Sequence, residues 1–165
     1  MALARRKFWF ARGAVFLALA VPVALWTARP LDASVGERVV SDRHTGLAIF
    51  GFDPVAYFTD ARAMAGRPEF EVQATDAVWR FRSEGNRAAF VANPDIYQPR
   101  YGGHDPLALG RGIALAGNPL VWVVADNRLY LFYTPQARED FARDPEAAIA
   151  AADARWPDVA AGLVQ

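Results

Sequence analysis

The sequence predicts an α+β domain, a small antiparallel sheet of hairpins with short helices packed on it. Two stretches each hold a pair of strand-like runs around a turn, and two later helices begin at a capping residue followed by proline. With 165 residues, 53% of them hydrophobic, the chain is long enough for one core and too short for two sizeable ones. We therefore expect one domain over residues 34–165, preceded by a leader over residues 1–33.

The leader combines a basic stretch, residues 5–12, with an apolar run, Ala14 to Trp26. This run is typical of a signal-peptide core and is shorter than the ~20 residues that span a bilayer. Because the cleavage sites after it are poor, an uncleaved membrane anchor remains the alternative. Arg5-Arg6-Lys7-Phe8 also matches a twin-arginine signal. Each reading exports the domain across the inner membrane, either into the periplasm or onto the membrane surface that faces it.

Charge and cysteine content exclude several classes of function. Five of the 18 basic residues lie in the first 30 positions, so residues 34–165 hold 13 basic against 17 acidic residues. A mildly acidic surface argues against nucleic acid as a partner. The chain has no cysteine, which excludes disulfides, thiolate nucleophiles and thiolate metal ligands.

The first hairpin is predicted over residues 69–82, where apolar and charged side chains alternate on both sides of a turn at Thr75-Asp76. The glutamates of one strand are expected to pair with the arginines of the other. Ser83 is typical of a helix N-cap, so a short helix over residues 84–92 should follow. Asn93-Pro94 should end this helix, because proline lacks an N–H group.

The second hairpin is predicted over residues 120–125 and 128–133, around a two-residue turn at Asp126-Asn127. Both runs are apolar on both faces, which indicates strands in the centre of the sheet. Helices should begin at Thr134-Pro135 and at Asp144-Pro145, the second extending to Arg155. No internal repeat is apparent in the sequence.

Two loops hold the candidate site residues. Asp53 precedes proline and could face a pocket together with Tyr57, although an Asp-Pro pair is also an ordinary turn former. In the second loop Gly102-Gly103 permits unusual backbone angles and presents His104 and Asp105. A metal site would need three or four ligands, for which Tyr101 and His44 are the remaining candidates.

Four blocks in a fixed order carry a resemblance to a known family. They are Gly51-Phe-Asp-Pro-Val-Ala-Tyr-Phe58, Trp79-Arg-Phe-Arg-Ser83, Asn93-Pro-Asp-Ile-Tyr97 and Tyr101-Gly-Gly-His-Asp-Pro106. Together they resemble the YHS domain family, whose members are small exported or accessory domains usually suspected of metal binding. The family's Tyr-Cys-Ala is replaced here by His104-Asp105-Pro106, and the resemblance does not by itself imply a metal.

Two hypotheses for function follow. In the first, an exported YHS-like domain binds a ligand through Asp53, Tyr57, Tyr101, Gly102 and Gly103, or a divalent transition metal through His104 and Asp105. In the second, the chain is a non-catalytic accessory protein that contacts a protein partner without a metal, and exposed aromatic surface would favour it. An enzyme is not expected, because no set of acid, base and nucleophile can be assembled from the sequence.

Overall fold

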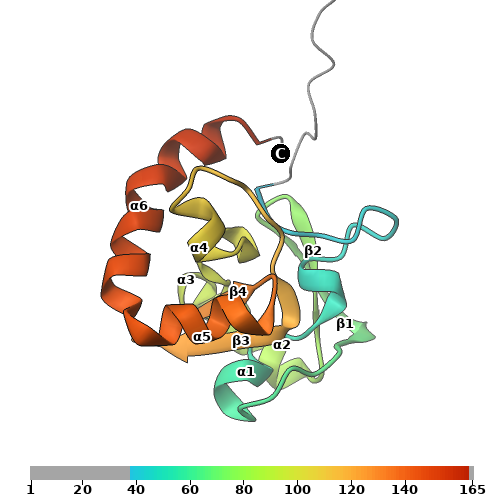
Figure 1. Cartoon of the computed structure of the whole chain (residues 1–165). Helices are drawn as coiled ribbons and strands as arrows, with labels where there is room; N and C mark the ends of the chain where they lie inside the picture. Colours follow the sequence, from blue (N-terminus) through green and yellow to red (C-terminus); the bar gives the residue numbers. More distant parts are fainter. Residues whose placement is uncertain (1–37, 164–165) are drawn as a thin grey trace, which may run out of the picture. The chain divides into compact units, whose positions relative to one another are not determined.

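Two short antiparallel hairpins, each followed by helices, form the part of the chain that the computed structural model describes, residues 38–163 (Figure 1). These residues belong to one unit, Ala33–Gln165. The predicted α+β class is confirmed by the small antiparallel sheets and the helices beside them. The predicted signal or anchor over residues 1–33 lies outside the described residues.

The first half of the domain, residues 49–97, begins with a 3₁₀ turn and ends with a short helix. Its elements are η1 (Ile49–Gly51), α1 (Ala56–Thr59), β1 (Arg67–Ala74), β2 (Ala77–Phe81), α2 (Glu84–Ala92) and α3 (Pro94–Tyr97). Ser83 Oγ accepts a hydrogen bond from the N–H of Asn86 (3.2 Å) and so caps α2 as predicted. The expected pairing of acid and base across this hairpin is confirmed by the ion pair of Glu71 with Arg80 (2.5 Å).

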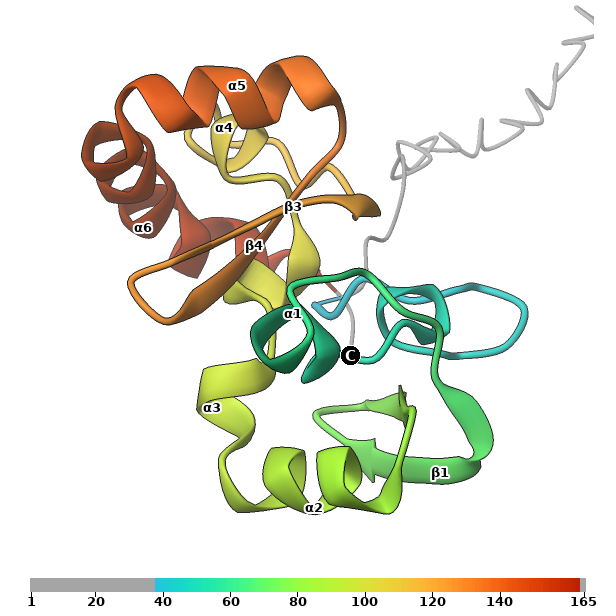
Figure 2. The same cartoon turned by 90° about the horizontal axis from the view of Figure 1, so that it is seen from below.

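The second half, residues 100–161, repeats this order. Its elements are η2 (Arg100–Gly103), α4 (Pro106–Leu109), β3 (Asn118–Ala125), β4 (Arg128–Phe132), α5 (Pro135–Arg143) and α6 (Pro145–Ala161). Thr134 and Asp144 cap α5 and α6 as predicted. In Figure 2, β1, α2 and α3 lie on one side of the view, and β3, β4, α5 and α6 lie on the other.

The two halves share their loop and strand contacts as well as their order, which makes an internal structural repeat that is not apparent in the sequence. The N–H of Asp53 bonds to Met64 O at 2.8 Å, and the N–H of Asp105 bonds to Leu115 O at 2.8 Å. In each half a glycine just before the hairpin then donates its N–H to a glycine of the preceding 3₁₀ turn: Gly66 to Gly51, and Gly117 to Gly103. In both hairpins the pairing register also shifts near the start of the first strand.

The aromatic core of each half follows the same plan. Phe90 of α2 packs against Trp79 and Phe81 of β2, with ring centroids 5.0 and 5.1 Å apart. Phe141 of α5 packs in the same way against the two aromatic residues of β4, at 5.2 and 5.0 Å. Each hairpin therefore holds its helix through one buried phenylalanine.

The structure corrects the predicted place of the second hairpin. Among the named strands of residues 38–163, β3 pairs only with β4 and β1 only with β2, so they form two separate two-stranded sheets. Val78 of β2 makes one further, isolated bridge, to Leu47. Leu129 and Leu131 of β4 belong to the core of the first half, whereas Tyr130 and Phe132 belong to that of the second half. The strand is apolar on both faces because it lies between two cores, not because it has a strand on each side.

The last helix is longer than predicted. α6 continues through Pro157 to Ala161, six residues beyond the expected end at Arg155. Trp156 and Val159 pack against the core of the second half. This packing holds the last turns in place although Pro157 has no N–H group.

Substituting alanine for Gly117 is expected to destabilise the domain by about 2 kcal/mol, a typical effect of overpacking. A Cβ atom there would lie 2.6 Å from Leu131 Cβ and 2.7 Å from Gly103 O. Gly85→Ala is the matched control, because that position is helical and open, and alanine should stabilise it by about 0.5–1 kcal/mol. Urea denaturation measures both changes, and equal effects of the two would contradict the close backbone approach at Gly117.

Candidate binding groove

The first loop is organised around Asp53, whose side chain is fully buried. Its Oδ1 accepts hydrogen bonds from the N–H groups of Val55 (2.8 Å) and Ala56 (3.4 Å) at the start of α1. Its Oδ2 accepts bonds from the N–H of Arg82 (2.8 Å) and the side-chain amide of Asn86 (2.7 Å). The carboxylate thus fastens the loop to the end of β2 and the start of α2.

Asp105 has the equivalent position in the second loop. Its Oδ1 accepts hydrogen bonds from the N–H groups of Leu107 (2.8 Å) and Ala108 (3.2 Å), and so caps α4. Its Oδ2 accepts a bond from the N–H of Tyr133 (2.8 Å), the residue after β4. Like Asp53, it joins its loop to the end of the following hairpin.

Tyr57 connects the first half to the second. The side chain is buried, and its hydroxyl donates a hydrogen bond to Pro119 O (2.9 Å) in β3. Its ring meets Trp122 edge to face at 5.1 Å. Burial, with the nearby charge of Asp53, raises the pKa of Tyr57 well above its ordinary value. The phenol therefore stays neutral and holds Pro119 in place.

Gly102 and Gly103 have a backbone role. Both have positive φ, and so does Tyr101 before them. A Cβ atom on Gly102 would lie 1.8 Å from Arg38 O, so only glycine allows the backbone of residues 38–39 to approach this loop. The N–H of Val40 donates to Gly102 O (2.8 Å) in the same contact.

Tyr101 and His104 of this loop pack under α6. The hydroxyl of Tyr101 donates to Asp153 Oδ1 (2.9 Å), which also pairs with Arg100 (2.7 Å). Burial and the bond to Asp153 raise the pKa of Tyr101. His104 is 4% exposed, and its ring lies 6.0 Å from that of Trp156. Both side chains thus lie inside the domain.

The predicted ligand and metal residues are therefore brought together in two equivalent loops, with side chains directed inward. His44 lies apart from them, exposed in the turn of residues 42–46. One imidazole and one carboxylate, from His104 and Asp105, are fewer ligands than a transition-metal site takes. Among residues 38–163 no group of three or more histidine, aspartate or glutamate side chains could hold a metal ion. Ligand or metal binding in these loops stays a prediction.

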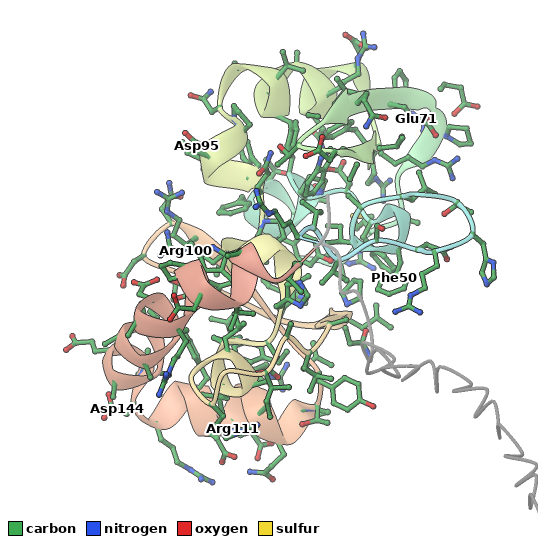
Figure 3. The ribbon with its side chains drawn as sticks, turned by 90° about the horizontal axis from the view of Figure 1, so that it is seen from above. Phe50, Glu71, Asp95, Arg100, Arg111 and Asp144 are labelled. Carbon is green, nitrogen blue, oxygen red and sulfur yellow. The ribbon has the colours of Figure 1, made fainter. Side chains whose placement is uncertain are left out.

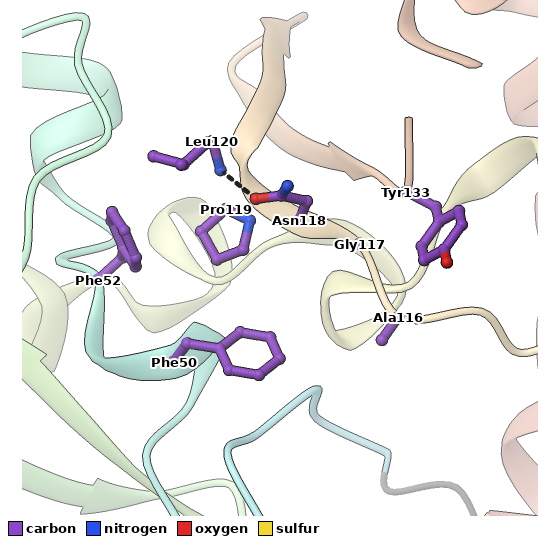
Figure 4. A pocket seen from close by; sticks show the side chains of 8 residues that line it. All are labelled: Phe50, Phe52, Ala116, Gly117, Asn118, Pro119, Leu120 and Tyr133. Carbon is purple, nitrogen blue, oxygen red and sulfur yellow. Dashed lines mark hydrogen bonds between the residues drawn. The ribbon is translucent and has the colours of Figure 1, made fainter. Parts of the chain in front are cut away.

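Beside the loops lies an open groove of about 410 Å³ (Figure 4). Its walls combine η1 of the first half with the start of β3 and the end of β4 in the second half. The lining residues are Phe50, Phe52, Ala116, Gly117, Asn118, Pro119, Leu120 and Tyr133. Three of them are large and exposed: Phe50 by 45%, Leu120 by 62% and Tyr133 by 57%. The groove therefore offers apolar surface to solvent.

The two loops give the groove its shape. Phe50 has a positive φ of 57° inside η1, where its side chain points outward (Figure 3). Tyr133 directly follows β4, and its backbone N–H donates a hydrogen bond to Asp105. Pro119 is held by Tyr57. Asp53, Tyr57 and Asp105 of the two motif loops thus support the groove from beneath, whereas Phe52 of the first motif lines it.

The lining of the groove carries no charged side chain, unlike two other hollows of similar size. One of these is lined in part by Glu84 and Arg87, and the other by Arg155 and Asp158. Exposed apolar side chains gathered around one hollow are a feature of sites that contact a protein or an apolar ligand. The phenol of Tyr133 is the one titratable side chain in its lining.

Sequence reasoning missed Phe50, Leu120 and Tyr133. They lie up to 83 positions apart in the chain, and none belongs to a motif that predicts exposure. Phe50 precedes the first motif and Tyr133 precedes a helix cap, and an aromatic residue at either place is ordinarily assigned to the core. Only the unusual backbone angle of Phe50 could have indicated that its side chain is exposed, and this angle is not visible in the sequence.

Comparison of the chain with known protein families, with curated proteins and with solved structures returns no match. Within residues 38–163, no helix has the length and apolar character needed to cross a bilayer.

Proposed function

We propose that this chain is an exported, non-catalytic binding domain of the YHS-like kind, which holds a protein partner in the groove between its two halves. The observation that carries the proposal is the group of three large exposed apolar side chains, Phe50, Leu120 and Tyr133, around one charge-free groove. Such side chains cost free energy when exposed to water, and a partner would relieve that cost.

Export is part of the proposal because of the basic and apolar stretches in the leader. The residues of the YHS-like motifs support the binding part of the proposal. Asp53, Tyr57 and Asp105 are buried and bonded to the protein itself, which is the role expected of residues that shape a binding surface. In this reading a cofactor is not needed for binding, and the partner is a protein met outside the cytoplasm.

A photo-crosslinking residue at position 120 tests this function in the cells that produce the protein. We expect a specific crosslinked product from position 120 and none from position 113, because Ile113 is similarly exposed (52%) but does not line the groove. The product should weaken at least several-fold when Phe50→Ala is added, as expected when a central contact is removed. Equal crosslinking from positions 113 and 120 would overturn the proposal.

A further inference from the structure

Three backbone groups along the groove are hydrogen-bonded within the domain. The N–H of Leu120 donates to Asn118 Oδ1 (2.9 Å), as the dashed line in Figure 4 shows. Pro119 has no N–H group, and its carbonyl oxygen accepts the hydroxyl of Tyr57 (2.9 Å). The N–H of Gly117 donates to Gly103 O (3.0 Å). A partner that adds a strand to an exposed sheet edge needs free backbone groups, and these three groups are already bonded within the domain.

The side chains of the groove supply its exposed recognition surface. Phe50, Phe52 and Tyr133 supply aromatic surface, and Leu120 supplies exposed apolar surface beside the buried Pro119 (Figure 4). Two exposed groups can donate hydrogen bonds, the hydroxyl of Tyr133 and the amide NH₂ of Asn118. The groove thus offers rings and donors but no charge.

This chemistry matches one conformation of an extended peptide. A polyproline II helix has no internal hydrogen bonds, so its carbonyl oxygens are available to donors such as Asn118 and Tyr133. Proline rings pack on aromatic side chains, and the stiff backbone loses little entropy on binding. Proline side chains carry no charge, so an uncharged proline-rich stretch places no charge against a lining that holds no charged residue.

We propose that the occupant of the groove is an uncharged, proline-rich segment of a partner protein, bound in the polyproline II conformation. This inference rests on the proposed binding function and specifies its ligand. Phe50 and Tyr133 would hold the proline rings from the two ends of the groove, and the Asn118 amide would donate to a backbone carbonyl between them.

A fluorescein-labelled nonaproline peptide is the probe, with the full chain in mild detergent and fluorescence anisotropy as the readout. We expect saturable binding that Phe50→Ala or Leu120→Ala weakens about tenfold, the effect of losing one central apolar contact. Tyr133→Phe, which removes only the hydroxyl, should weaken it about threefold to tenfold, as for one hydrogen bond. Ile113→Ala and Val91→Ala are exposed apolar controls outside the groove and should leave binding unchanged.

Two competitors distinguish the possible occupants. An unlabelled peptide of alternating valine and threonine should not displace nonaproline, and displacement by it at equal concentration would overturn the polyproline II assignment. A peptide copying residues 27–37 tests the chain's own segment, and tighter binding of that peptide than of nonaproline would also overturn it.

The crosslinking experiment distinguishes a failure of this inference from a failure of the binding function on which it rests. If nonaproline does not bind while position 120 still crosslinks specifically in cells, the proline-rich ligand is wrong and the binding function stands. If neither result is obtained, both proposals fail. Binding that survives Phe50→Ala, Leu120→Ala and Tyr133→Phe would place the peptide outside the groove and overturn the inference.

Discussion

Replacing Asp53 by alanine is expected to lower the free energy of unfolding by about 3–5 kcal/mol, since each buried donor left without a partner costs about 1–3 kcal/mol. The side chain is fully buried and accepts four hydrogen bonds, three from backbone N–H groups and one from the Asn86 amide. Its removal releases the first loop from both the hairpin and α2. Chemical denaturation followed by circular dichroism measures the change.

Three variants give this experiment its controls. Asp53→Asn keeps the size of the side chain but turns an NH₂ group toward donors, so it should lose roughly half as much stability. Asp105→Ala should be less harmful than Asp53→Ala, because Asp105 accepts three hydrogen bonds. Asp60→Ala, at an exposed position, should change stability by about 0.5 kcal/mol or less. A loss at Asp60 equal to that at Asp53 would contradict the structural role of Asp53.

Phe141→Ala is expected to lower the free energy of unfolding by about 3–5 kcal/mol, the usual result of emptying a buried aromatic site. Phe141 is 1% exposed and lies between the rings of Tyr130 and Phe132. The cavity would form where α5 meets the second hairpin. Thermal or urea denaturation gives the magnitude, and near-UV circular dichroism reports the loss of ordered aromatic packing.

The internal repeat supplies a matched comparison for this prediction. Phe90→Ala removes the equivalent ring from the first half, with the same two-ring contact, and should destabilise the domain by a similar amount. Phe50→Ala makes the same chemical change at a 45% exposed position and should leave stability almost unchanged. A small loss of stability for Phe90→Ala together with a large loss for Phe141→Ala would show that the two halves do not contribute equally to the free energy of unfolding.

Much of the fold was predictable because its signals are local. Ser83, Thr134 and Asp144 accept hydrogen bonds from N–H groups three residues ahead of them, so the chain near each cap specifies the helix start. The turns at Thr75-Asp76 and Asp126-Asn127 have the positive φ angles that the hairpins require. Alternation of apolar and charged residues was enough to orient β2, with Trp79 and Phe81 inward.

The candidate site was predictable only in part. The motifs located both loops, and the structure shows that Asp53 and Asp105 occupy equivalent places in them. Whether an Asp-Pro residue also ties its loop to the following hairpin depends on donors far along the chain, at Arg82 for the first loop and Tyr133 for the second. The repeat was hidden for a similar reason: the equivalent contacts involve backbone groups, which leave much of the side-chain sequence free to differ.

The sequence by itself thus determined the α+β class, the caps, the turns and the inward faces of the first hairpin, because each depends on neighbouring residues or on strand periodicity. The tertiary structure alone decided that β4 lies between two cores, that the motif aspartates bond inward, and that Phe50, Leu120 and Tyr133 meet at one groove. These features depend on contacts between residues tens of positions apart. Only the packed chain brings such residues together.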